Sequence, residues 1–81
     1  MALIQVRYYG GAAAAAGAAT ELADADTLGE LLDQLATAHP GSLDRVLAVA
    51  SVLVDGTVVR DRLSRLVAGQ TVDILPPFAG G

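Results

Sequence analysis

The sequence contains no cysteine and no lysine among its 81 residues. Without cysteine, the chain has no disulfide, no thiolate ligand for a metal, no nucleophilic thiol and no side chain that could carry a persulfide. Without lysine, it can form no Schiff base and offers no Walker-type lysine to a nucleotide phosphate. These absences exclude several kinds of catalytic side chain by a count alone.

Positive charge and long hydrophobic runs are scarce as well. Five arginines stand against nine acidic residues, which gives a net charge of −4. Nucleic-acid backbones are bound by clustered Lys and Arg, and no such cluster is present, so we expect no nucleic-acid partner. The longest stretch of small apolar residues, 10–19, is shorter than the ~18 residues of a membrane span, and residues 1–7 show no export signal. We therefore expect no membrane partner and a cytoplasmic location.

What the chain does have is a set of short strand patterns. Polar and apolar residues alternate along the first of them, with Ile4, Val6 and Tyr8 expected to face inward. Asp55-Gly56 is a strong signal for a two-residue hairpin turn. In the last strand, Val72 and Ile74 are expected to point inward and Leu75 outward. The expected strands are residues 3–9, 20–23, 51–54, 57–59 and 71–75.

The clearest helix lies between Asp24 and Gly41. Thr27 and Glu30 fit a capping box at its start, and His39-Pro40-Gly41 ends it. One stripe of the helix should face the core, and it consists of Leu28, Leu31, Leu32 and Leu35.

The remaining segments are predicted to be short or irregular. Residues 12–19 are expected to form a loop with at most one helical turn, because glycines flank the alanines. Ser42 should cap a second short helical stretch. Residues 60–66 should form an irregular connection in which Leu63 and Leu66 cover the core.

The order of these elements predicts an α+β fold. One main helix packed on one face of a mixed four- to five-stranded sheet is a ubiquitin-like β-grasp roll. The length suits one domain, so we expect residues 1–81 to form a single domain with residues 76–81 as a flexible C-terminal reactive tail.

No internal active site emerges from the motifs. Gly11 and Gly17 do not have the spacing of a phosphate loop, and Asp24 and Asp26 are better explained by helix capping than by calcium. His39 is the only histidine, and at a helix end it is expected to interact with free carbonyl groups. We predict no metal site and no tightly bound cofactor.

The end of the sequence carries the most specific signal. Pro76-Pro77 favours an extended conformation that projects the tail off the sheet, and Phe78 follows as an apolar anchor. Six residues span at most about 20 Å, enough to enter a partner's active site. Gly80 and Gly81 would fit a narrow channel, and a terminal carboxylate is ionised at neutral pH. The reactive group is therefore predicted to be the α-carboxylate of Gly81.

Residues 67–81, VAGQTVDILPPFAGG, resemble the tail of the small subunit of molybdopterin synthase, a MoaD/ThiS-type ubiquitin-like sulfur carrier. The helix that starts at Thr27, the Asp55-Gly56 hairpin and the chain length fit that family too, so the resemblance covers essentially the whole chain. Only the tail motif is specific. Gln70, where the family usually has aspartate, Asp55, where asparagine is frequent, and the alanine-rich loop are departures.

The resemblance implies a chemistry for the tail. An E1-like adenylating enzyme would use ATP to activate the carboxylate of Gly81, and a sulfur donor protein would convert it to a thiocarboxylate. The tail would then enter the large subunit of molybdopterin synthase and give its sulfur to cyclic pyranopterin monophosphate. In this scheme the chain is a sulfur-carrying subunit, and the catalytic side chains belong to its partners. The residues expected to contact those partners are Leu75, Pro76, Pro77, Phe78 and Ala79, with Gly80 beside the reactive group.

Other functions fit the same residues. The chain could carry sulfur for thiamine or cysteine biosynthesis. It could also be a ubiquitin-like modifier joined to lysines of other proteins, although without lysine it cannot build side-chain-linked chains on itself. A plain interaction module with an unreactive tail is the third alternative.

Overall fold

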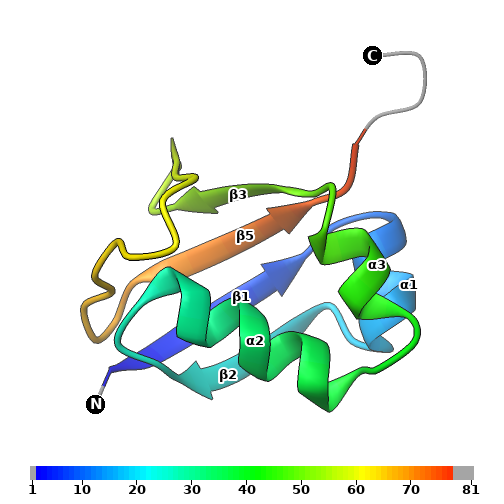
Figure 1. Cartoon of the computed structure of the whole chain (residues 1–81), viewed down its shortest axis with the longest axis horizontal. Helices are drawn as coiled ribbons and strands as arrows, with labels where there is room; N and C mark the ends of the chain where they lie inside the picture. Colours follow the sequence, from blue (N-terminus) through cyan, green and yellow to red (C-terminus); the bar gives the residue numbers. More distant parts are fainter. Residues whose placement is uncertain (1, 78–81) are drawn as a thin grey trace.

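The computed structural model describes residues 2–77, which form a mixed five-stranded sheet with three helices on one of its faces (Figure 1). The strand order is β2-β1-β5-β3-β4, with β1 and β5 parallel and the other pairs antiparallel. The elements in chain order are β1 (Leu3–Tyr8), α1 (Gly11–Ala16), β2 (Thr20–Asp24), α2 (Leu28–Ala38), α3 (Leu43–Leu47), β3 (Ser51–Val54), β4 (Thr57–Val58) and β5 (Thr71–Leu75). This is the α+β, β-grasp arrangement expected from the sequence.

The core lies between the helices and the covered face of the sheet. Ile4, Val6 and Tyr8 of β1 are buried while the residues between them are exposed, so the predicted alternation is confirmed. Val72 and Ile74 of β5 are fully buried beside them. Because β1 and β5 are the central pair, the two strands farthest apart in sequence form the middle of the core.

Helix α2 supplies the other side of that core. Leu28, Leu31 and Leu35 are buried, as predicted, and Leu32 packs at the margin. The Glu30 N–H donates to the Thr27 hydroxyl at 3.2 Å, which confirms the cap. The Glu30 carboxylate accepts from the N–H of the residue before Thr27, at 3.1 Å, so the reciprocal half of the capping box is shifted by one position.

The alanine-rich segment is a six-residue helix, and the expectation of a loop was wrong. Ala12 and Ala16 lie one turn apart and are both buried, so packing stabilises a helix that the flanking glycines argued against. Ser42 does not cap α3: its hydroxyl donates to the Ala15 carbonyl at 3.0 Å. This hydrogen bond joins the start of α3 to α1, which gives the hydroxyl at position 42 a structural role other than capping.

The segment after β4 is irregular, as predicted, but only one of its two leucines covers the core. Leu66 is buried, whereas Leu63 is 80% exposed, so the expectation for Leu63 was wrong. Asp61 explains the difference, because its carboxylate accepts the Leu63 N–H at 2.9 Å and its carbonyl accepts the Ser64 N–H at 3.0 Å. The tight turn that results points Leu63 into solvent.

Candidate functional site

The base of the tail is held on both sides by the sheet. The Tyr9 N–H donates to the Ile74 carbonyl at 3.1 Å, which continues the β1–β5 pairing beyond the end of β1. On the other side, Leu75 pairs with Ser51 at the start of β3. The chain therefore leaves the sheet from its centre, with a neighbouring strand fixing it on each side.

Gly10 completes the base of the tail from the β1 side. Its backbone has φ +52°, a conformation that disfavours residues with a side chain. A Cβ atom placed at Gly10 would lie 3.4 Å from Cγ of Pro76. A glycine here thus permits both the turn into α1 and the approach of the proline ring, a role that the sequence reasoning missed.

The predicted partner-binding residues are only in part described. Leu75 lies on the uncovered face of the sheet, as predicted from its alternation with Ile74, but it is half-buried rather than exposed. Pro76 is half-buried and Pro77 is exposed. The remaining predicted site residues, Phe78, Ala79, Gly80 and Gly81, lie outside the described residues.

An ion pair that the sequence reasoning missed lies at the centre of the uncovered face. Arg7 Nε donates to Asp73 Oδ1 at 2.6 Å and Arg7 Nη2 to Asp73 Oδ2 at 3.0 Å, across the register-matched position of β1 and β5. The hydrogen bond to Asp73 has the largest effect on the pKa of Arg7 and raises it. Burial lowers this pKa by less, and the charges of Asp73 and Tyr9 raise it by smaller amounts. Asp73 is the only charged or polar residue among 2–77 that is buried.

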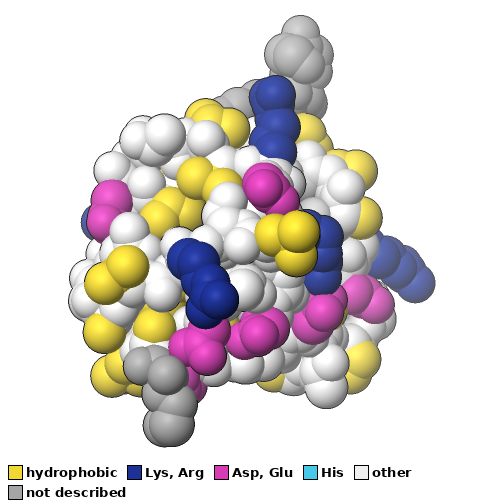
Figure 2. Space-filling model, turned by 60° about the vertical axis from the view of Figure 1, so that its left-hand side comes forward, with side chains coloured by type: hydrophobic (Ala, Val, Ile, Leu, Met, Phe, Trp, Pro, Cys, Tyr) yellow, Lys and Arg dark blue, Asp and Glu magenta, His cyan; other side chains and the backbone are white. Residues whose placement is uncertain are grey.

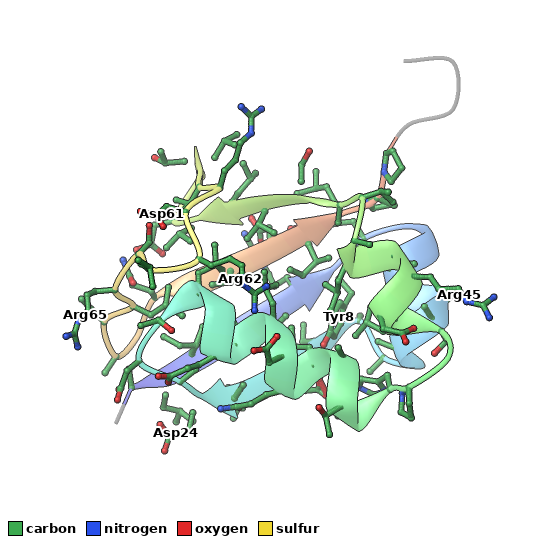
Figure 3. The ribbon with its side chains drawn as sticks, in the orientation of Figure 1. Tyr8, Asp24, Arg45, Asp61, Arg62 and Arg65 are labelled. Carbon is green, nitrogen blue, oxygen red and sulfur yellow. The ribbon has the colours of Figure 1, made fainter. Side chains whose placement is uncertain are left out.

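A second polar network lies on the covered side of the sheet. The Tyr8 hydroxyl donates to Glu21 Oε1 at 2.7 Å, and Nε2 of His39 lies 3.0 Å from Glu21 Oε2. Burial, and then the bond to Glu21, raises the pKa of Tyr8 well above its usual value. Tyr8 lies beneath the helices (Figure 3). The expectation that His39 would interact with free carbonyl groups was wrong, because the imidazole binds a carboxylate instead.

The uncovered face of the sheet carries exposed apolar side chains among polar ones. Leu22 is 66% exposed, and Leu3 and Val58 are also more than half exposed. Figure 2 shows the left-hand edge of the molecule as drawn in Figure 1, where acidic and basic side chains lie close together with hydrophobic side chains between them. By strand register, the face is formed by Leu3, Gln5, Arg7, Thr20, Leu22, Asp24, Ser51, Leu53, Val58, Thr71, Asp73 and Leu75.

A shallow groove lies on the opposite side, between α2 and the β3–β4 edge. Its volume is about 360 Å³, and its walls are mainly apolar, with Arg60 and Arg62 at the rim. Ser51 is the only hydroxyl in its lining, with no histidine or carboxylate beside it as a base. The groove therefore lacks the nucleophile and base of an internal active site.

Within residues 2–77, no group of three or more His, Cys, Asp or Glu side chains could hold a metal ion. No helix in the same part of the chain is long and apolar enough to cross a membrane.

Comparisons with known proteins agree with this architecture. A family model described as the ThiS family matches residues 6–81. SAMP1 from Haloferax volcanii is 28% identical with a TM-score of 0.83, over 98% of this chain and 99% of that chain. A comparison with curated proteins gives no match.

Two further solved structures are complexes that share the fold. In the complex of subunits 1 and 2 of the molybdopterin-converting factor from Helicobacter pylori, the similar chain is 23% identical, with a TM-score of 0.76 over 98% of this chain and 99% of that one. In the BexX/CysO complex from Amycolatopsis orientalis, the values are 24% and 0.77, over 96% and 99%. At these identities the likeness supports the fold alone.

Proposed function

The chain belongs to the ThiS family, and we propose on that premise that it is the sulfur carrier subunit of a molybdopterin synthase. The carboxylate of Gly81 is adenylated, converted to a thiocarboxylate and used to donate sulfur to cyclic pyranopterin monophosphate in molybdenum cofactor biosynthesis. The ubiquitin-like fold of the family suits this role, because it presents a chain end without an internal active site.

One observation carries the proposal: the central strand β5 leads directly into the Pro-Pro-Phe-Ala-Gly-Gly sequence. Hydrogen bonds from Tyr9 and pairing with Ser51 fix the strand up to Leu75, so the root of the tail has a defined position. The family match extends to residue 81 and so includes Gly80 and Gly81. A rigid root followed by a slender tail favours delivery of a terminal group into a partner's active site.

The proposed chemistry needs only the terminal carboxylate from this chain. One carboxylate oxygen attacks the α-phosphorus of ATP, the bond to pyrophosphate breaks, and an acyl-adenylate forms. A nucleophilic sulfur at the sulfide level then displaces AMP and leaves a thiocarboxylate. When the sulfur passes to the pterin, water supplies the oxygen that restores the carboxylate. Proton transfers and charge stabilisation in these steps belong to the partner enzymes.

The partners follow from this sequence of steps. They are an E1-like adenylating enzyme, a sulfur donor protein and the large subunit of molybdopterin synthase. We propose the cytoplasm as the location of these steps. The uncovered sheet face is the surface we assign to these proteins, because Leu75 belongs both to that face and to the root of the tail. Two of the similar structures are themselves complexes of two different proteins, which supports a protein partner.

The second candidate is a ubiquitin-like modifier. It is favoured by the 27% identity to the Haloferax volcanii protein described as small archaeal modifier protein 1, which exceeds the identity to the molybdopterin-converting factor. The same activated Gly81 would then be joined to a lysine of another protein. A sulfur carrier for thiamine or cysteine biosynthesis remains a third use of the same chemistry.

Intact-mass analysis tests the proposal. The chain is incubated with a purified E1-like enzyme, ATP and a sulfur source, and we expect one oxygen to be replaced by sulfur. Addition of the large synthase subunit and cyclic pyranopterin monophosphate should then restore the original mass and yield molybdopterin. A thiocarboxylate that the large subunit leaves unchanged would contradict the assigned pathway, and isopeptide-linked adducts would favour the modifier.

A further inference from the structure

The Arg7–Asp73 ion pair occupies the middle of the surface that we assign to the partner proteins. Asp73 stands two residues before Leu75 on the same face of β5, with Arg7 beside it in register on β1. The Asp73 side chain is 9% exposed, whereas that of Arg7 is 47% exposed. The arginine is thus the accessible half of the pair.

The guanidinium of Arg7 has donors to spare. Of its five N–H groups, two bind Asp73, and the other three have no partner among residues 2–77. Asp73 holds the guanidinium plane through both of its oxygens, so the free donors keep a fixed direction. Tyr9, partly exposed, lies near enough to influence the same group. Arginine and tyrosine are the residue types that most often anchor protein interfaces.

Covering this face has a consequence for the free donors. A partner that packs on the leucines around Arg7 removes water from three N–H groups, and this is unfavourable unless an acceptor replaces the water. A carboxylate is the strongest such acceptor, because its hydrogen bonds to a guanidinium are charge-assisted. A purely apolar partner surface would fit the leucines but leave the arginine unsatisfied.

We infer that Arg7 is a partner-recognition residue, which donates to a carboxylate on the adenylating enzyme when that enzyme receives the tail. Asp73 acts through Arg7 as a positioning residue. The inference rests on the proposed function, since it assumes that the tail is activated by such an enzyme. It adds a requirement for the partner: an apolar surface with one acidic side chain opposite the centre of the sheet.

The pair could instead serve only to stabilise the sheet. A double substitution distinguishes that structural role from partner recognition. Asp73 is the buried member of this pair and Arg7 is half-exposed. Replacing both members by apolar residues of similar size removes the buried charge together with its partner, whereas removing Arg7 alone leaves the charge of Asp73 uncompensated. The variant Arg7→Met with Asp73→Val therefore keeps the sheet intact while removing the donors. A structural role predicts normal activation of this variant, and a recognition role predicts weakened binding.

The test measures adenylation as ATP–pyrophosphate exchange with the purified E1-like enzyme. For the double variant we expect a melting temperature at or above that of the wild type, a KM for this chain raised by at least about tenfold, and an unchanged kcat. The wild-type KM should rise with salt concentration more steeply than that of the double variant, because a charge contact has been lost. The double variant keeps the net charge of the wild type, because it loses one positive and one negative side chain. Arg45→Met is the control for losing an arginine elsewhere: its side chain on α3 points away from the molecule (Figure 3), and the substitution should leave KM unchanged.

Several outcomes overturn the inference. A folded double variant with the wild-type KM would show that the pair is only structural, and an equal rise in KM for Arg45→Met would show that losing any arginine weakens binding, whether or not it lies on this face. If the double variant does not fold, Arg7→Lys decides, since it keeps the charge but loses the planar donors and should still raise KM severalfold. Failure of the wild-type chain to be adenylated overturns the proposed function and this inference with it.

Discussion

At the scale of single residues, Glu21 joins three elements through one carboxylate. It accepts from the Tyr8 hydroxyl of β1 at 2.7 Å and lies 3.0 Å from the imidazole of His39 at the end of α2. Tyr8 is nearly fully buried, so its hydroxyl needs this acceptor. The network therefore fixes the far end of α2 against the β1–β2 hairpin.

The raised pKa of Tyr8 predicts a loss of stability in alkali. A folded-state pKa above the unfolded value of 10.0 contributes stability that is present below that value and is lost as the pH rises toward the folded pKa. We expect Tyr8→Phe to cost about 1 kcal/mol at neutral pH, from the lost hydrogen bond, and to flatten the decline above pH ~10. Urea unfolding at several pH values measures both effects. Tyr9→Phe is the control. An equal flattening of the stability decline in that variant would show that the assignment of the titration to Tyr8 is wrong.

The proposed reactive group predicts a strict dependence on tail length. Deleting Gly81, or adding one residue after it, displaces the carboxylate by about 3.3–3.6 Å. Gly80→Val adds a branched side chain where the partner's channel is expected to be narrow. All three variants should fold, with stability within ~0.5 kcal/mol of the wild type, and should not be adenylated. Thiocarboxylate formation that survives the deletion would show that the terminal Gly-Gly is only a tail.

Phe78 is predicted to be an anchor for the partner proteins. Burying an aromatic side chain contributes roughly 1.5–3 kcal/mol, so Phe78→Asp should weaken binding by about tenfold or more. We expect thermal unfolding to stay nearly unchanged. Calorimetric titration with the adenylating enzyme and with the large synthase subunit measures the effect, and unaltered affinity for both would rule out the anchor.

At the scale of elements, α2 is stabilised by one apolar stripe, and a matched pair of leucines tests it. Leu35 is 2% exposed in that stripe, whereas Leu63 is 80% exposed in the Asp61 turn. Leu35→Asp buries an uncompensated charge and should unfold the domain, while Leu63→Asp should change stability by less than ~0.5 kcal/mol. Circular dichroism melts compare the two. A normal melt for Leu35→Asp would mean that α2 does not need its stripe.

The difference between these two leucines also shows what could be predicted from the sequence. The alternation around Val6 and the spacing around Leu31 are local patterns, and each identifies a buried face without knowledge of the rest of the chain. The exposure of Leu63 depends on hydrogen bonds in its own turn, and the helix at residues 11–16 depends on packing against distant residues. Local patterns cannot reveal either.

The candidate site also has one part that the sequence predicts and one part that it does not. Its tail is a contiguous motif and could be read from residues 76–81, although residues 78–81 lie outside the described structure. The Arg7–Asp73 pair joins residues 66 positions apart, and no sequence signal linked them. An acidic residue between Val72 and Ile74, in an otherwise apolar strand, was the one available hint. A charged residue in such a strand indicates that another side chain neutralises it, but the sequence does not show that this side chain is Arg7.

At the scale of the whole molecule, the two faces of the sheet have different tasks. The covered face packs on the helices and supplies the core, with β1 and β5 at its centre. The uncovered face keeps exposed leucines and the accessible guanidinium of Arg7 beside the root of the tail. Exposed apolar groups of this kind mark interaction surfaces more often than they arise by accident. Under the proposed function, stability and recognition are therefore separated on opposite sides of one sheet.

The parallel pairing of β1 with β5 has a consequence for the order in which the chain can acquire its structure. The contacts between β1 and β5 close a loop of about 66 residues. Closing this loop costs conformational entropy, and only the pairing of the two strands offsets that cost, so β1 cannot complete its pairing before β5 has been made. During synthesis, β1 can pair with β2 early, but the core around Val6 stays open until β5 has left the ribosome. The strand that completes the core also leads into the tail that we propose to be reactive. On that proposal, a chain able to offer its carboxylate to an enzyme is one that has already finished folding.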